Sequence, residues 1–190
     1  SSPSSPSRVQ ASARRSLPLG WVSRVFMASM PCWRQACRMR ASSAATTVRA
    51  VVQRSGIDPA RIDDVVMAQS YANSEVPCVG RWAALQAGLP VSVPGMQLDR
   101  RCGGGLQAIV TAAMMVQSGA ADVVIAGGVE SMSNIEYYST DMRWGARSGN
   151  VRFFDRLERG RERSQPVERF GKISGMIETA ENLARDYGIT

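Results

Sequence analysis

Three short apolar segments of this chain have the pattern of β-strands. The runs "DVVMAQ" (64–69) and "ADVVIAGG" (121–128) are almost continuously apolar, as in strands covered on both faces of a parallel sheet. Between them, Met96 and Leu98 alternate with polar neighbours, which suits a shorter strand. The sequence therefore predicts three strands, two of them buried.

The segments between these strands have helical spacing. "AATTVRAVVQRSG" reads as a helix that ends at Gly56, and "CVGRWAALQAG" as a helix that ends at Gly88. A third helix is predicted from the glycines after Cys102 to about Gln117. Its apolar residues recur at the spacing of one helix face, which we expect to pack on the core: Leu106, Ile109, Val110, Ala113 and Met114.

Strands that alternate with helices of this length are typical of βαβ units and a mainly parallel sheet. The predicted fold class is therefore α/β with layered βαβ units, and its core is assigned to residues 45–135. A chain of 190 residues is long enough to form one domain with its own hydrophobic core.

Residues 1–44 differ in composition from the rest of the chain. They are rich in Ser, Arg, Pro and Ala and show no sustained periodicity. An organellar transit peptide, a disordered extension and a stretch translated out of frame would each give this composition. The chain has 22 arginines and one lysine, Lys172, as GC-rich coding DNA would give, and reading such DNA out of frame yields mostly Arg, Ser, Pro and Ala. We favour the third explanation, for a reason given below.

Residues 136–172 carry both charge signs and several aromatic residues but no long apolar pattern. They read as a surface excursion or subdomain rather than as sheet, although a long solvated loop is the simpler alternative. A further helix is predicted in "GMIETAENLARDYG", with one face formed by Ile177, Ala180, Leu183 and Ala184.

The net charge of +7 does not describe the folded part of the chain. Residues 1–57 contain nine arginines and no acidic residue, whereas residues 58–190 contain 14 basic and 16 acidic residues, a net charge of 14 − 16 = −2. The basic pI therefore does not support a nucleic-acid partner for the domain. No apolar run approaches the ~20 residues of a membrane span, so no membrane partner is expected.

Four cysteines and the absence of histidine limit the possible chemistry. The cysteines have no C-x-x-C spacing, so we expect neither a zinc site nor any other metal site. So few cysteines in a chain of this length also argue against a disulfide framework.

Cys102 lies where the short strand passes into the third helix. The first N–H groups of a helix are free, and its dipole places about half a positive charge there. Arg100 and Arg101 precede the cysteine. Both features would favour the thiolate, which is the nucleophilic form. The glycines at 103–105 would let a ligand or another backbone approach the cysteine closely. The simpler alternative to a reactive thiol is that Cys102 is a small buried residue at a helix start.

The same turn also fits a second kind of site. Gly103, Gly105 and Ala108 match the G-x-G-x-x-G/A fingerprint of dinucleotide-binding folds, after a strand and at the start of a helix. The fingerprint also requires an acidic residue at the end of the next strand. The nearest candidate is Glu130, which lies beyond the expected end of that strand and follows two glycines.

Four stretches together resemble the N-terminal half of a thiolase. They are "RAVVQRSGIDPARIDDVVMAQ", "GRWAALQAGLPVSVPGMQLDRRCGGGLQAI", "GAADVVIAGGVESMSN" and "GMIETAENLARDYGI". The resemblance covers about residues 46–190 and is to acetyl-CoA acetyltransferases and 3-ketoacyl-CoA thiolases. It implies a layered α/β fold built from two similar halves, with a loop domain inserted in the first.

The resemblance implies that Cys102 is the nucleophile that takes an acyl group from acyl-CoA as a thioester, with its backbone N–H in an oxyanion hole. Residues 136–190 would be the start of the loop domain that holds coenzyme A, which is a substrate, and no separate cofactor is expected. Met176 falls where the family has a methionine that contacts pantetheine; the alternative is a plain core methionine. Glu130, Ser131 and Met132 would be structural, near a subunit contact in a dimer or tetramer.

The sequence departs from the thiolase pattern in three places. Gly104 replaces a usual serine, which would loosen the turn. The first strand of the family should precede the helix at 46, but residues 1–44 occupy its place, which is why we favour the out-of-frame explanation. Loss of a central strand would expose a sheet edge. The activating histidine, a second histidine and the second catalytic cysteine belong to the C-terminal half, and this chain has no histidine.

The resulting expectation is a truncated thiolase-type acyltransferase that does not turn over by itself. Two alternatives are a dinucleotide-binding α/β module and a non-catalytic fragment that associates with an intact homologue. A cytoplasmic location is expected, or a mitochondrial one if residues 1–44 are a transit peptide.

Overall fold

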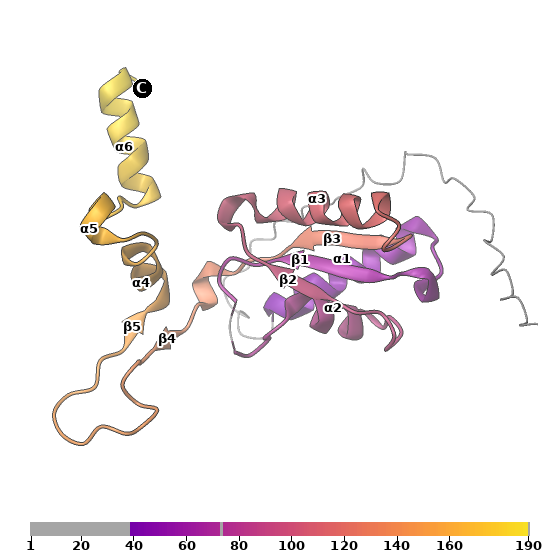
Figure 1. Cartoon of the computed structure of the whole chain (residues 1–190), viewed down its shortest axis with the longest axis horizontal. Helices are drawn as coiled ribbons and strands as arrows, with labels where there is room; N and C mark the ends of the chain where they lie inside the picture. Colours follow the sequence, from indigo (N-terminus) through magenta and orange to yellow (C-terminus); the bar gives the residue numbers. More distant parts are fainter. Residues whose placement is uncertain (1–38, 73, 190) are drawn as a thin grey trace, which may run out of the picture.

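Strand β1 (Asp64–Ala68) is the centre of the observed sheet. The computed structural model describes residues 39–72 and 74–189. Strand β1 pairs in parallel with β2 (Met96–Leu98) on one side and with β3 (Val124–Gly128) on the other (Figure 1). The three predicted strands and the predicted parallel sheet are therefore confirmed, with β3 starting later than expected.

Alternate residues of β1 contribute to two separate apolar cores, because successive side chains of a strand point to opposite faces. Val65 and Met67 belong to the core beneath α1 (Met39–Ser55) and α2 (Val79–Ala87). Val66 and Ala68 belong to the core beneath α3 (Gly104–Gln117). Figure 1 shows the resulting layers, with α3 on one side of the sheet and α1 and α2 on the other.

The predicted helix ends agree with the structure. Gly56, after α1, has a φ of 66°, and Gly88, after α2, has a φ of 89°. Helix α1 begins at Met39 rather than at Ala45, so it extends into the segment interpreted as a tail. The interpretations of residues 1–38, as transit peptide, disordered extension or out-of-frame stretch, lie outside the described residues.

The predicted core face of α3 is wrong for three of its five residues, whereas Ile109 and Ala113 are half-buried. The fully buried positions of this helix are Gly104, Ala108 and Ala112, and they face the sheet. Leu106 is 69% exposed, and Val110 and Met114 are also exposed. Small residues let the helix axis approach the sheet closely, so the bulky stripe points outward. We call Leu106, Val110 and Met114 the outer stripe of α3.

Strand β1 has no free edge in the described sheet. Strand β1 is paired along both sides, with Val66 opposite Met96 in one ladder and opposite Ala126 in the other. The edges of the described sheet are those of β2 and β3, and the expectation that loss of the family's first strand exposes a sheet edge stays a prediction.

Residues 136–189 form an extension with its own small elements. Strands β4 (Tyr137–Tyr138) and β5 (Phe154–Asp155) pair antiparallel. The Asp155 carboxylate accepts a hydrogen bond from the Tyr137 hydroxyl, and its negative charge raises the pKa of this tyrosine. Three helices follow: α4 (Arg156–Glu162), α5 (Val167–Phe170) and α6 (Met176–Tyr187). The segment is therefore not a plain solvated loop, and its assignment as the start of a loop domain stays a prediction.

None of the helices among residues 39–72 and 74–189 combines the length and the apolar character needed to cross a membrane.

The arrangement of α3 predicts opposite sensitivities on its two sides. Ala108→Leu should lower the free energy of unfolding by about 1 to 3 kcal/mol, because the larger side chain must enter a filled space beside Val66 and Ala68. Leu106→Ala should change it by less than about 0.5 kcal/mol, as expected of an exposed side chain. Urea unfolding of the 190-residue chain, followed by circular dichroism, measures both. An equal loss in the two variants would show that the outer stripe is buried in solution.

Candidate active site

Cys102 lies in the short turn that joins β2 to α3, in the 3₁₀ helix Arg101–Gly103. Its side chain is exposed, so the alternative of a small buried cysteine is wrong. The turn stands at the carboxyl end of a parallel strand and directly before a 14-residue helix. A thiol in this place is accessible and is close to the N-terminus of α3, where the dipole of the helix favours negative charge.

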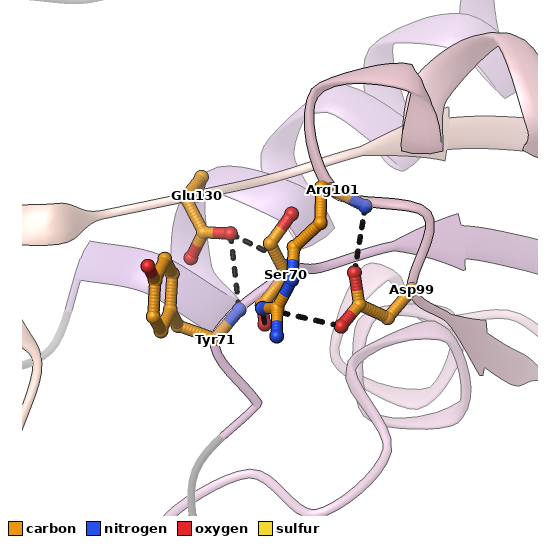
Figure 2. Close-up of polar contacts among 5 residues, drawn as sticks. All are labelled: Ser70, Tyr71, Asp99, Arg101 and Glu130. Carbon is orange, nitrogen blue, oxygen red and sulfur yellow. Dashed lines mark hydrogen bonds and ion pairs between the residues drawn. The ribbon is translucent and has the colours of Figure 1, made fainter. Parts of the chain in front are cut away.

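The turn is attached to the end of β1 through Arg101. One guanidinium nitrogen, Nη1, donates a hydrogen bond to the backbone oxygen of Ser70 at 2.8 Å and lies 3.3 Å from Oδ2 of Asp99. The guanidinium carbon is 5.4 Å from the centre of the Tyr71 ring. Figure 2 shows Arg101 reaching from the turn toward Asp99 on one side and Ser70 on the other.

The end of β1 is in turn attached to the segment after β3. The Glu130 carboxylate accepts hydrogen bonds from the backbone N–H groups of Ser70 (2.8 Å) and Tyr71 (3.2 Å) (Figure 2). The carboxyl ends of all three parallel strands are thereby joined. We call Ser70, Tyr71, Asp99, Arg101 and Glu130 the strand-end network.

The structural role expected of Glu130 is confirmed by these bonds, whereas its place near a subunit contact stays a prediction. Ser131 and Met132 lie beyond the network, where the Ser131 hydroxyl accepts a hydrogen bond from the Asn134 amide. Sequence reasoning used Arg101 only as a charge and missed Ser70, Tyr71 and Asp99. The signal was available, because the carboxyl ends of parallel strands meet at one edge of a sheet.

Among the three glycines, Gly104 is the one that permits a close approach. It is buried, and a Cβ built on it would lie 3.0 Å from the Cβ of Ala68. A Cβ on Gly103 would come no nearer than 3.7 Å to another group, and one on Gly105 would meet open space. Within the described chain, close approach is therefore seen at Gly104, which packs α3 onto β1, whereas approach of a ligand to these glycines stays a prediction.

The dinucleotide-binding alternative does not agree with the topology. In a dinucleotide-binding βαβ unit the two strands joined by the helix are neighbours. Here β1 lies between β2 and β3, the strands that α3 joins. The one acidic candidate, Glu130, already accepts two backbone hydrogen bonds.

A polar pocket of about 230 Å³ lies beside the strand-end network, where α4 of the extension approaches the core. Its lining includes Gln69, Gln97 and Arg156. Gln69 is only 4% exposed, and its side-chain oxygen has no hydrogen-bond partner among the residues that the structure describes. The pocket has room for several water molecules.

The other described cysteine, Cys78, differs from Cys102. It is half-buried at the start of α2, and its sulfur lies 3.4 Å from the backbone oxygen of Gly95, to which the thiol donates. In the described part of the chain, no group of three or more His, Cys, Asp or Glu residues is placed to hold a metal ion.

Met176 is the first residue of α6 and is 77% exposed, so the alternative of a core methionine is wrong. Helix α6 belongs to the extension and lies away from α3 of the core (Figure 1). The structure therefore does not bring Met176 and Cys102 together, and its role at a substrate stays a prediction.

Comparisons with known proteins identify the family. The sequence model described as "Thiolase, N-terminal domain" matches residues 38–190. The chain is 33% identical over 149 residues to an acetyl-CoA acetyltransferase of Cupriavidus necator, which covers 77% of this chain and 36% of that protein. It is 36% identical over 147 residues to an acetyl-CoA acetyltransferase of Pseudomonas aeruginosa, with the same two coverages.

A solved structure agrees with these relatives. The crystal structure of the Bacillus anthracis acetyl-CoA acetyltransferase matches with a TM-score of 0.69 and 36% sequence identity, over 80% of this chain and 37% of that one. This chain thus spans little more than a third of the length of the relatives it matches. The family match over residues 38–190 and the common α/β fold show that this chain belongs to the thiolase family, whose N-terminal domain it matches.

Proposed function

We propose that this chain carries the nucleophile of a thiolase-type acyltransferase and that Cys102 is this nucleophile. The observation that supports the proposal is the position of Cys102, exposed in the turn between a parallel strand and the N-terminus of α3. The relatives are named acetyl-CoA acetyltransferases, which makes acyl-CoA the proposed substrate and coenzyme A the leaving group.

In the proposed step, the Cys102 thiolate attacks the carbonyl carbon of the acyl thioester. A new carbon–sulfur bond forms to Cys102, the bond to the coenzyme sulfur breaks, and coenzyme A leaves as a thiolate that takes up a proton. The carbonyl oxygen gains negative charge on the way. The backbone N–H of Cys102 is our candidate donor to this oxygen, because those of Gly103 and Gly104 already bond to Arg100 and Arg101.

The second half of the reaction needs groups that these 190 residues do not contain. Removing a proton from the α-carbon of a second acyl-CoA requires an acid/base group, and the thiolase pattern takes its histidines and its second catalytic cysteine from the C-terminal half. The sequence has no histidine. We therefore propose that the 190-residue chain accepts an acyl group but does not complete a catalytic cycle.

The extension is proposed to take part in binding coenzyme A, with Met176 against the pantetheine arm. Assembly into a dimer or tetramer and a cytoplasmic location remain predictions for this chain.

Acyl transfer can be tested by measuring the intact mass of the 190-residue chain after incubation with acetyl-CoA. We expect one acetyl group, located at Cys102 by peptide mapping, because this thiol is exposed whereas Cys78 is half-buried. Cys102→Ser should abolish the adduct and Cys78→Ser should retain it. A folded sample that gains no acetyl group, or gains it equally on Cys78, would contradict the proposed nucleophile.

The absence of turnover can be tested by the coupled thiolysis of acetoacetyl-CoA. The chain should show no rate above the uncatalysed reaction, because the sequence has no histidine to serve as the base that activates the thiol in the thiolase pattern. Steady turnover that disappears in Cys102→Ala would show that another group supplies this base.

One alternative function is supported by a separate observation. The outer stripe of α3 is apolar and exposed, which favours association with another protein, such as an intact homologue. Mixed with the full-length Cupriavidus necator acetyl-CoA acetyltransferase, this chain should then co-elute in size-exclusion chromatography. The double variant Leu106→Gln/Val110→Gln should elute separately, and co-elution that survives these changes would exclude the outer stripe as the contact.

A further inference from the structure

Arg101 has a backbone conformation that needs support. Its φ of 47° makes it the one non-glycine residue with a positive φ in the described part of the chain. This left-handed conformation brings Cβ close to the following carbonyl oxygen, so it persists only where surrounding contacts hold it. The residue directly precedes Cys102. The direction in which the cysteine leaves the turn therefore depends on how Arg101 is held.

Contacts on both the backbone and the side chain hold Arg101 in place. The Asp99 carboxylate accepts a hydrogen bond from its backbone N–H at 2.8 Å. Its guanidinium donates to the Ser70 backbone oxygen and pairs with the same carboxylate (Figure 2). A planar guanidinium can engage several acceptors at once, whereas a lysine ammonium acts as a point charge on a flexible stem.

The surface to which Arg101 is attached is itself fixed. Ser70 and Tyr71 are held by the Glu130 carboxylate through their backbone N–H groups. Ser70 directly follows Gln69, whose backbone N–H bonds to Leu98 at the end of β2. Arg101 therefore connects the turn to the end of the sheet rather than to a free loop.

The charge of Arg101 is compensated by Asp99. With a carboxylate oxygen 3.3 Å from the guanidinium, the pair presents little net charge toward Cys102. The expectation that Arg101 favours the thiolate through its positive charge is thus not supported by this geometry. Its contribution would be to position the turn.

We propose that Arg101 is a positioning residue for Cys102: through Ser70 and Asp99, it holds the turn in the conformation from which the thiol accepts an acyl group. This inference rests on the proposed function of Cys102 as nucleophile. It requires the shape of the guanidinium and not merely its positive charge.

The test compares Arg101→Lys with Arg100→Lys, since both conserve charge at neighbouring exposed positions of the turn. The rate of acetyl transfer from acetyl-CoA to Cys102 is measured by intact mass. We expect Arg101→Lys to slow it about tenfold or more, and Arg100→Lys to change it less than about twofold. The pH profile of Cys102 alkylation by iodoacetamide should be the same in all three proteins, because the charge of the turn does not change.

Two results would overturn the proposal. The first is acetylation of Arg101→Lys at the rate of the unchanged chain, which would show that the guanidinium contacts are not needed. Acetylation of Arg101→Gly at that rate would show the same, because glycine adopts a positive φ without side-chain contacts. A shift of the alkylation profile in Arg101→Lys would show that the role is electrostatic.

A second measurement separates this proposal from the proposed function. If the unchanged chain folds but accepts no acetyl group, Cys102 is not a nucleophile in this chain. The positioning of the turn by Arg101 is then measured by amide hydrogen exchange. The N–H groups of Gly103 and Gly104 should then exchange at least about threefold faster in Arg101→Lys than in Arg100→Lys, with α1 and α2 unaffected. Equal exchange in the two variants would overturn the positioning role independently of acyl transfer.

Discussion

Burial of β1 on both faces is the constraint on which the rest of this chain depends. One face of the strand carries Val65 and Met67 into the core under α1 and α2, and the other carries Val66 and Ala68 into the core under α3. Backbone ladders on both sides leave β1 without a free edge in the described sheet. Each helix is therefore placed by the strand it covers, and the ends of the strands are brought together at one edge.

That edge is where the candidate chemistry lies. Parallel strands that run side by side present their carboxyl ends, and the turns that follow them, on the same side of the sheet. The strand-end network uses this arrangement, because one arginine and two carboxylates connect the turn with Cys102 to the segments that follow β1 and β3. The position of the thiol thus depends on three distant parts of the sequence rather than on the local turn alone.

Helix α3 shows how one helix can serve two surfaces. Its small residues Gly104, Ala108 and Ala112 face the sheet, and its outer stripe of Leu106, Val110 and Met114 faces outward. A helix that is apolar all round is typical of the interior of a larger protein. The chain spans 36% of the length of the two curated relatives reported above.

The sequence by itself determined the strands, the helices with their glycine ends, the parallel α/β class and the position of Cys102 at a strand-to-helix turn. These features depend on local periodicity and on glycine, which act within a few residues. Only the tertiary structure decided which side of α3 is buried, because a helix with apolar residues on several sides gives no single preferred face. It alone also brought Ser70, Asp99, Arg101 and Glu130 together, since contacts between the ends of different strands depend on strand order, which local periodicity does not encode.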